Sequence, residues 1–322
     1  MGVWIAGNYT LAACRYLARQ GYRLSVITPG IEREDIINIL RDLAPKFRNL
    51  IIAGYPPFVM DVFCDVIEKR GIRLKNEIRI LTAGDKFSEE WRNAIMQLLK
   101  MKDPLRSVVS IYGSAEAGIL GYETPLSIFI RRQAVLNKNL YKELFGEEKE
   151  EPALVQYDPR HIFFEEKDGE LILTAKAGIP LIRYNIHDIG RIVSYQEMIS
   201  LLKKFSLYER ARGENLLGWR LPLVVKKGRT DVAVTFYALN VFPENIKAAA
   251  RDKKVAKYLS GNFIAYNRTL ADQRTQKLYI EFEVTQGTKA SQKKEKAVLE
   301  SLLRNFIKLN MEFRKLYSAL GN

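Results

Sequence analysis

The first 118 residues alternate short β-branched runs with helical patterns, and this alternation constrains the fold more than any other feature of the chain. Helical patterns occupy residues 10–20, 32–44, 57–69 and 88–100. The strand-like runs around them read "VWIAG", "LSVIT", "NLIIAG", "IRILTAG" and "SVVSIYG". Strands that alternate with helices predict a mainly parallel sheet with helices on both faces. We therefore expect a large α/β domain.

Four of these strand-like runs end in a glycine-bearing loop. The loops read "AGNYT", "AGYPP", "AGDKFS" and "YGSAEAG". Open α/β sheets bind ligands outside the carboxyl ends of their strands, so these loops should line one crevice. Glu116 belongs to the last loop, where two alanines and two glycines surround its carboxylate.

The middle of the chain has a β-rich pattern. Apolar and polar residues alternate on each side of Asp168-Gly169, a dipeptide favoured in two-residue hairpin turns. A second strand pair is expected around residues 179–195. The acidic stretch "LFGEEKEEP", residues 144–152, is expected to be a solvated surface loop. This region predicts a β-rich appendage to the large domain.

A polar turn sequence, "VVKKGRTD", separates this pattern from the last part of the chain. We place the domain boundary there, with a large domain at residues 1–227 and a small domain at residues 228–322. The small domain reads as strand, helix, strand, strand and one long final helix, a βαββα unit of α+β type. A unit of this size could move as a lid.

The formal net charge of +14 raises the hypothesis of a nucleic-acid partner. The last 76 residues carry 16 Lys and Arg against 7 Asp and Glu, and many of these cations fall on the final amphipathic helix. Basic residues on the solvent-exposed face of a packed helix do not imply a nucleic-acid partner. No aromatic-basic strand motif or basic helix-turn-helix accompanies the charge, so the pattern disfavours nucleic-acid binding.

Targeting signals and membrane segments are not evident in the sequence. No charged-then-apolar leader opens the chain, and no apolar run approaches the roughly 20 residues that span a bilayer. The two cysteines, Cys14 and Cys64, lie in apolar helical patterns and are expected to be buried thiols in a reducing compartment. We expect a cytoplasmic location and no membrane partner.

Several common catalytic and nucleotide motifs are missing. The first strand-turn-helix pattern offers Gly7 alone in place of G-x-G-x-x-G, and its second strand ends in Thr28 where a ribose-binding acid would stand. The sequence has no G-x-x-x-x-G-K-[ST] loop. It has only two histidines and no G-x-S-x-G elbow, which argues against Ser-His-Asp hydrolysis.

Four other fragments are informative in their order. They read "LTAGDKFSEEWR", "IYGSAEAG", "IPLIRYNIHDIGR" and "KGRTDVAVTFYALNVFPENIKAA". In order and spacing they resemble the core motifs of adenylate-forming (AMP-binding) enzymes, and "AGYPPF" resembles the phenylacetate-CoA ligase-like branch. The resemblance implies a ligase that joins a carboxylic acid to AMP from ATP with magnesium and passes the acyl group to CoA or another thiol.

The resemblance also assigns roles to residues. It implies that Glu116 holds magnesium and that Ser114, beside Ala115, faces the α-phosphate. Asp188 would accept both ribose hydroxyls, with Arg229 closing on the sugar and phosphate. Glu116, Ser114 and Arg229 are thus the implied catalytic residues. The remaining implied nucleotide contacts come from the two glycine loops: Gly84, Asp85, Lys86, Tyr112 and Gly113.

Three further expectations follow from the resemblance. Asp231 matches the hinge between the two domains, and Tyr55 and Phe58 are possible walls for an apolar acid. The family's early Ser/Thr/Gly-rich phosphate loop and its late catalytic lysine have no counterpart in the sequence. Two alternatives therefore stay open: a non-catalytic nucleotide-binding or interaction protein of this fold, and a basic nucleic-acid-binding protein.

Overall fold

The computed structural model describes residues 5–148, 151–230, 234–237 and 239–320. The chain divides into two compact units, Met1–Arg229 and Thr230–Asn322. The boundary expected from the sequence, between residues 227 and 228, lies close to this division.

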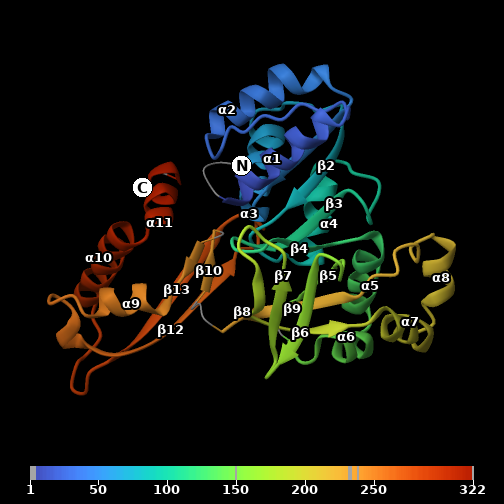
Figure 1. The fold of residues 1–322 in the computed structure, drawn as a ribbon. Coiled ribbons are helices and arrows are strands. Elements are labelled where there is room, and N and C mark those ends of the chain that lie inside the picture. The colour runs from blue at the N-terminus through green and yellow to red at the C-terminus, as the bar shows by residue number, and fades with distance from the viewer. Residues whose placement is uncertain (1–4, 149–150, 231–233, 238, 321–322) are drawn as a thin grey trace. The chain divides into compact units, whose positions relative to one another are not determined.

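The large unit contains the predicted alternation of strands and helices from residue 49 onward (Figure 1). The local sequence explains where two of the helices begin. Pro56 occupies the first turn of α3, where its missing N–H costs nothing, and the Ser88 side chain accepts a hydrogen bond from the Trp91 N–H at the start of α4. The elements are β1 (Asn49–Gly54), α3 (Pro56–Cys64) with its π-helical extension η3 (Asp65–Lys69), β2 (Glu77–Thr82), α4 (Glu89–Leu98) and β3 (Val108–Ser114).

The two strands predicted before residue 30 are wrong in the described part of the chain. Residues 5–7 begin helix α1 (Ile5–Arg19), and residues 24–28 have no regular structure. Residues 24–28 pair with no strand of the described chain, and β1 consequently forms the edge of the sheet, where it pairs only with β2. The helix predicted at residues 32–44 forms as α2 (Arg33–Asn38) and two short turns, η1 (Ile39–Leu43) and η2 (Ala44–Lys46).

Nine strands of the described residues form one sheet, in the order β1-β2-β3-β4-β5-β9-β8-β7-β6. The pairs β1–β2 and β2–β3 are parallel, and every later pair is antiparallel. The predicted α/β fold class is confirmed. The β-rich appendage does not form a separate sheet, because it continues the edge of the parallel strands.

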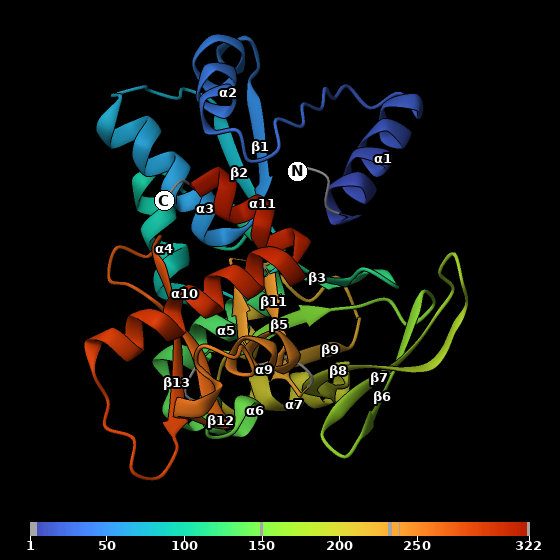
Figure 2. The ribbon, with the colours of Figure 1, turned by 90° about the vertical axis from the view of Figure 1, so that its left-hand side faces the viewer.

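The antiparallel strands begin with a hairpin between β3 and β4 (Gly118–Tyr122). Asp168-Gly169 connects β6 to β7, as predicted, and both residues have positive φ angles of 53° and 82°. Figure 2 shows β6 and β7 as a hairpin that extends away from the rest of the large unit. The other strands are β5 (Ala153–Gln156), β6 (Ile162–Lys167), β7 (Glu170–Ala175), β8 (Leu181–Val193) and β9 (Leu223–Arg229).

Three buried apolar clusters support the large unit. One lies around α3 and α4, a second lies between the helices α5–α8 and the strands β5, β8 and β9, and a third lies between β3, β4 and the β6–β8 strands. Because β3 contributes to all three clusters, the strand that carries "IYGSAEAG" is anchored from both faces. The helices are α5 (Pro125–Leu136), α6 (Lys138–Phe145), α7 (Tyr195–Lys204) and α8 (Tyr208–Gly213).

The small unit has two two-stranded sheets and three α-helices among its described residues. The predicted single final helix is wrong, because it breaks at Asn310. The extended backbone of Asn310 ends α10, and its side-chain oxygen accepts a hydrogen bond from the Phe313 N–H at the start of α11. The elements are β10 (Val234–Phe236), β11 (Leu239–Val241), α9 (Pro243–Ala250), η4 (Ala256–Tyr258), β12 (Leu259–Thr269), β13 (Gln276–Val284), α10 (Gln292–Leu309) and α11 (Met311–Leu320).

Candidate functional site

The loops that follow β1 and β2 are joined by a side-chain hydrogen bond. Tyr55 comes directly after β1, and its hydroxyl donates to Asp85 Oδ2 at 3.2 Å. Asp85 comes after β2 and Gly84, whose φ of +95° is a conformation that favours glycine. Because parallel strands end at the same sheet edge, this bond brings two of the predicted residues, Tyr55 and Asp85, together.

The same loop is attached to β9. The Lys86 ammonium donates to the carbonyl oxygen of Lys227 at 3.0 Å, and the Lys86 N–H donates to Asp85 Oδ1 at 2.8 Å. Burial raises the pKa of the half-buried Asp85 carboxyl, although the hydrogen bonds from the Lys86 N–H and the Tyr55 hydroxyl and the nearby charge of Lys226 act in the opposite direction. Gly84, Asp85 and Lys86 thus form a loop fixed between β1 and β9.

Tyr112 and Asp188 form the most buried polar pair among the predicted residues. The Tyr112 hydroxyl donates to Asp188 Oδ2 at 2.5 Å, and the two residues are 6% and 2% exposed. Burial, followed by the negative charge of Asp188, raises the pKa of Tyr112 well above its usual range. The phenol therefore stays protonated and serves as a fixed donor to the carboxylate.

The other oxygen of Asp188 faces two cations. Lys226 Nζ lies 3.5 Å and Arg229 Nη1 lies 3.9 Å from Asp188 Oδ1. Asp188 and Arg229 are a cross-strand pair of β8 and β9, which explains their proximity. Within the described residues, Oδ1 is buried and accepts no hydrogen bond. A buried carboxylate oxygen without a donor has an unmet demand that a ligand hydroxyl could satisfy.

The geometry of the β3–β4 hairpin explains why glycines lie on both sides of Glu116 in the sequence. A Cβ atom on Gly113 would lie 2.7 Å from the carbonyl oxygen of Gly118, and Gly118 has a φ of +75°. Ser114 Oγ accepts a hydrogen bond from the Ala117 N–H at 3.1 Å. The hairpin therefore needs its glycines for its tight geometry, and the Ser114 side chain stabilises the turn.

Glu116 lies at the exposed tip of this hairpin, next to the exposed Ala115. Its carboxylate makes no hydrogen bond or ion pair with the part of the chain that the structure describes. No group of three or more His, Cys, Asp or Glu side chains in that part is arranged to hold a metal ion. Glu116 could therefore supply a single ligand to a cation, with the remaining ligands coming from elsewhere.

The remaining predicted residues lie in several parts of the chain. Phe58 is half-buried in α3 and packs against the apolar cluster around α3 and α4. Cys64 is buried in α3, and Cys14 is half-buried in α1. Asp231, the predicted hinge, lies outside the described residues.

Sequence reasoning missed a buried ion network directly behind the two glycine loops. Its four members are at most 4% exposed: Glu89, Arg92, Glu123 and Arg131. Arg92 Nη2 donates to Glu123 Oε1 at 2.7 Å, and Arg131 Nη1 lies 3.2 Å from Glu89 Oε1. The only hint in the sequence is the pair of opposite charges at the i, i+3 positions Glu89 and Arg92.

This buried ion network also makes hydrogen bonds to the backbone of β3 and to the backbone of the loop that follows β2. Glu123 Oε2 accepts a hydrogen bond from the Ser110 N–H in β3 at 2.8 Å, and Arg131 donates to the carbonyl oxygen of Phe87, directly after Lys86. Glu151 also joins it, because its carboxylate accepts a hydrogen bond from the Glu89 N–H at 2.9 Å. The acidic stretch at residues 144–152 is therefore not simply a solvated loop.

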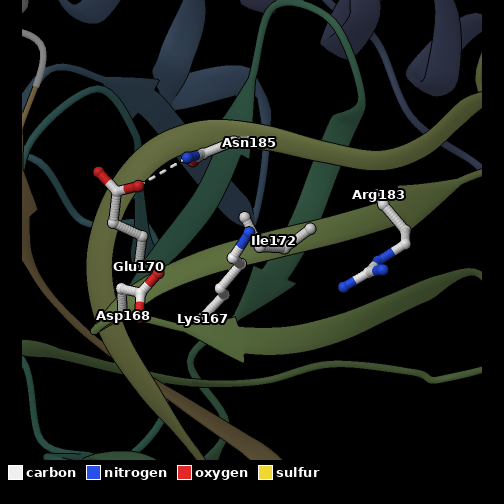
Figure 3. Close-up of a pocket in the computed structure, with 6 residues that line it drawn as sticks. All are labelled: Lys167, Asp168, Glu170, Ile172, Arg183 and Asn185. Carbon is white, nitrogen blue, oxygen red and sulfur yellow. Dashed lines mark hydrogen bonds between the residues drawn. The ribbon is translucent and has the colours of Figure 1, made fainter.

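A separate open hollow of about 400 Å³ lies at the β6–β7 hairpin (Figure 3). Figure 3 shows Glu170 and Asn185 joined by their 2.6 Å hydrogen bond at one side of it and Arg183 at the other. Side chains alternate along β7, and Leu171, the partner of Asp188, belongs to the buried cluster that contains Tyr112. Glu170 and Ile172 line the hollow, so it opens on the other face of β7 from the Asp188 carboxylate.

No protein-family model and no curated protein matches the sequence of the chain. Among solved structures, several ligases and synthetases have a fold similar to that of the chain at low sequence identity. They include the amide bond synthetase McbA from Marinactinospora thermotolerans (11% identity, 85% of this chain and 47% of that chain, TM-score 0.47) and the o-succinylbenzoate CoA synthetase MenE from Bacillus subtilis (10%, 84% and 47%, TM-score 0.45). The carboxylic acid reductase A-PCP didomain from Segniliparus rugosus is another (13%, 85% and 36%, TM-score 0.43). The chain spans about half the length of the first two.

A membrane-spanning helix is not found in the described residues, because none of their helices is both long and apolar enough to cross a bilayer.

Proposed function

We propose that the chain is the nucleotide- and acid-binding part of an ATP-dependent carboxylic acid ligase. In this reaction a carboxylate oxygen of the acid attacks the α-phosphorus of ATP. The new oxygen–phosphorus bond forms an acyl adenylate, and the bond to pyrophosphate breaks. A thiol, such as that of CoA, then attacks the acyl carbon and AMP leaves. Fixed donors and cations that face the transferring phosphate would stabilise its charge.

The observation that carries this proposal is the buried Asp188 carboxylate. Tyr112 occupies Oδ2, whereas Oδ1 accepts no hydrogen bond among the described residues and faces Lys226 and Arg229. A vicinal diol offers hydroxyl donors to such an oxygen, and Arg229 favours a ligand that also carries negative charge. A ribonucleotide combines both groups.

The β3–β4 hairpin supports a role at the phosphates. Gly113 and Gly118 carry no side chain, so a ligand could approach the hairpin backbone closely. Magnesium prefers oxygen ligands and commonly takes one or two carboxylates together with substrate phosphates. The single exposed carboxylate of Glu116 fits that role, and we assign magnesium to it. When bound, magnesium would neutralise charge on the phosphates.

The acid and thiol sites are proposed on the resemblance to the phenylacetate-CoA ligase-like branch. Tyr55 and Phe58 would border an apolar acid, although Tyr55 already binds Asp85 and Phe58 packs in the α3–α4 cluster. The small unit, from residue 228, would act as the lid, with Asp231 as its hinge. CoA or a carrier thiol would be the acceptor.

A second candidate function is nucleotide binding without catalysis. It is favoured by the Glu116 carboxylate, which makes no hydrogen bond or ion pair within the described part of the chain. In that case the buried Asp188 acceptor would still select a ribonucleotide, and no acid would be activated.

Two measurements separate these functions. Calorimetric titration with ATP, with and without magnesium, tests the nucleotide site. Exchange of labelled pyrophosphate into ATP across a panel of aryl and acyl acids tests adenylation. Acid-dependent exchange would establish the ligase, whereas ATP binding without exchange would favour the second candidate. Failure to bind ATP under either condition would refute both.

A further inference from the structure

Lys226 lies in the candidate site although no motif pointed to it. Its ammonium lies 3.5 Å from Asp188 Oδ1 and 5.9 Å from the centre of the Tyr112 ring, and its side chain is 27% exposed. Its positive charge also acts on Asp85. One lysine therefore acts on two carboxylates of the candidate site, Asp188 and Asp85.

A β-bulge explains this position. In the pairing of β8 with β9, Lys226 lies opposite Gly190 and Gly228 lies opposite Ile189, so Lys227 is an extra residue on β9. Side chains alternate along a regular strand, and residues 226 and 229 would then point to opposite faces. The bulge shifts this alternation by one residue, which lets Lys226 and Arg229 both approach Asp188.

The bulge is itself held in place. The carbonyl oxygen of Lys227 accepts the hydrogen bond from Lys86 Nζ. Opposite it, Gly190 has no space for a side chain, because a Cβ atom there would lie 2.3 Å from the carbonyl oxygen of Val225. The two lysines of the bulge consequently differ, since Lys226 faces Asp188 and Lys227 Nζ lies 3.3 Å from Glu148 Oε1.

We propose that Lys226 is a positioning residue for ribose recognition, which holds the Asp188 carboxylate in place to accept the sugar diol. This inference rests on the proposed nucleotide-binding function. A buried carboxylate pays a desolvation penalty that a nearby cation offsets. Tyr112 holds one oxygen of Asp188, and Lys226 with Arg229 stabilises the charge on the other. Lys226 therefore acts through Asp188 and not by contacting the phosphates.

The test measures sugar selectivity. ATP, 2′-deoxyATP and inorganic tripolyphosphate are titrated calorimetrically into the full chain and into Lys226→Met, Lys226→Arg and Lys227→Met. A hydrogen bond to a charged group corresponds to about tenfold or more in affinity. We expect Lys226→Met to lose about tenfold in affinity for ATP and less than about threefold for 2′-deoxyATP. The preference for the ribonucleotide then nearly disappears.

The other variants are controls. Lys226→Arg keeps the positive charge and should restore the preference for ATP over 2′-deoxyATP. Lys227→Met removes the same charge from the adjacent position and should leave the preference unchanged. Circular dichroism of each variant confirms that it is folded. Should Lys226→Met be unfolded, the comparison of Lys226→Gln with Lys226→Arg measures the same selectivity.

Three outcomes would overturn the inference. Equal losses for ATP and 2′-deoxyATP would make Lys226 a general structural residue, and an equal loss for tripolyphosphate would make it a phosphate contact. An unchanged preference in Lys226→Met would exclude a role in sugar recognition. These results leave the proposed nucleotide site intact. If the unaltered chain binds neither nucleotide, the proposed function fails and the inference fails with it.

Discussion

At the scale of single residues, the candidate site contains hydrogen-bonded and ion-paired side chains and one carboxylate, Glu116, that has neither kind of partner among the described residues. Tyr112, Asp188 and Arg229 lie together as the motifs imply, and Tyr55 adds a contact to Asp85. Glu116 makes no hydrogen bond or ion pair within the described residues. Substitutions at these two kinds of position should therefore differ in their effect on the fold.

Glu116→Gln should reduce magnesium-dependent ATP binding or turnover without lowering the free energy of unfolding. The amide keeps the size of the side chain but loses the charge that a magnesium ion requires. Removing such an electrostatic contact costs roughly a hundredfold in rate where catalysis occurs. Titration with ATP at several magnesium concentrations measures the effect, and thermal unfolding provides the control. Equal ATP affinity of the unaltered chain with and without magnesium would argue against a metal at Glu116.

Tyr112→Phe should remove a pH-dependent part of the stability. The pKa of Tyr112 is higher in the folded chain than in the unfolded chain, because of burial and the adjacent Asp188. Its contribution is therefore fully present below the unfolded pKa of about 10 and is lost as the pH rises through the higher folded value. Denaturant unfolding of both proteins between pH 7 and pH 11 measures the difference. A constant difference across this range and an early tyrosinate signal at 295 nm would contradict the buried Tyr112–Asp188 pair.

At the scale of elements, the buried ion network connects helices to the strand and loop that carry the site. Arg131 belongs to α5 and binds the carbonyl oxygen of Phe87, and Glu123 binds the backbone of β3. The parts of the candidate site that belong to β2, β3 and β4 are therefore held by charges with almost no access to water.

Arg131→Met should lower the free energy of unfolding by about 3–5 kcal/mol, because it leaves Glu89 and Glu123 with too little positive charge in a buried setting. The neighbouring Arg132→Met is a matched control. Arg132 is 25% exposed on its side chain and should cost about 1 kcal/mol or less. Urea unfolding of both variants gives the comparison. Similar losses in the two variants would mean that burial does not amplify the effect at Arg131.

Strands were predictable where a β-branched sequence pattern coincides with an adjacent strand in the sheet. The strands predicted at residues 49–54, 78–84 and 107–113 form as β1, β2 and β3 and pair with one another, whereas residues 24–28 carry a similar β-branched pattern and pair with no strand among the described residues. The break at Asn310 was missed because an amphipathic period continues through it, and a capping side chain is a weaker signal than the period.

The candidate site was predictable from short motifs only in part. Asp188, Arg229 and Tyr112 were found because each belongs to a sequence fragment, and the structure brings these three together. The place of Lys226 in the site was not predictable. Its side-chain orientation depends on a β-bulge between β8 and β9, and this bulge interrupts the regular alternation of side chains along β9. The buried ion network was missed because its members come from separate parts of the sequence, residues 89–92, 123 and 131.

At the scale of the whole molecule, each of the two units has its own buried core. Ile128 lies in the core of the large unit and Ile246 in that of the small unit, and both are fully buried. All described residues of the candidate site belong to the large unit. The stability of each unit, and the effect of a ligand on it, can therefore be measured separately.

Calorimetric unfolding should show two transitions, as is common for chains with two domains. Ile128→Ala and Ile246→Ala should each lower the stability of its own unit by about 2–5 kcal/mol, the usual cost of a cavity. ATP should raise only the transition that Ile128→Ala lowers, because a ligand stabilises the unit that binds it. A single transition shifted equally by both substitutions would show that the units unfold together.

The strand order of the large sheet also determines when the chain can complete it during synthesis. β5 pairs with β4 through one residue pair, Tyr122↔Gln156, and with β9 along its whole length, from Ala153↔Lys226 to Gln156↔Leu223. β1, β2 and β3 can pair as they leave the ribosome, but β5 must wait until β9 has been made. Until then its apolar residues are an open strand edge, the kind of surface that aggregates or recruits chaperones. The slow step of folding should be the arrival of β9, which also delivers Lys226 and Arg229 to Asp188.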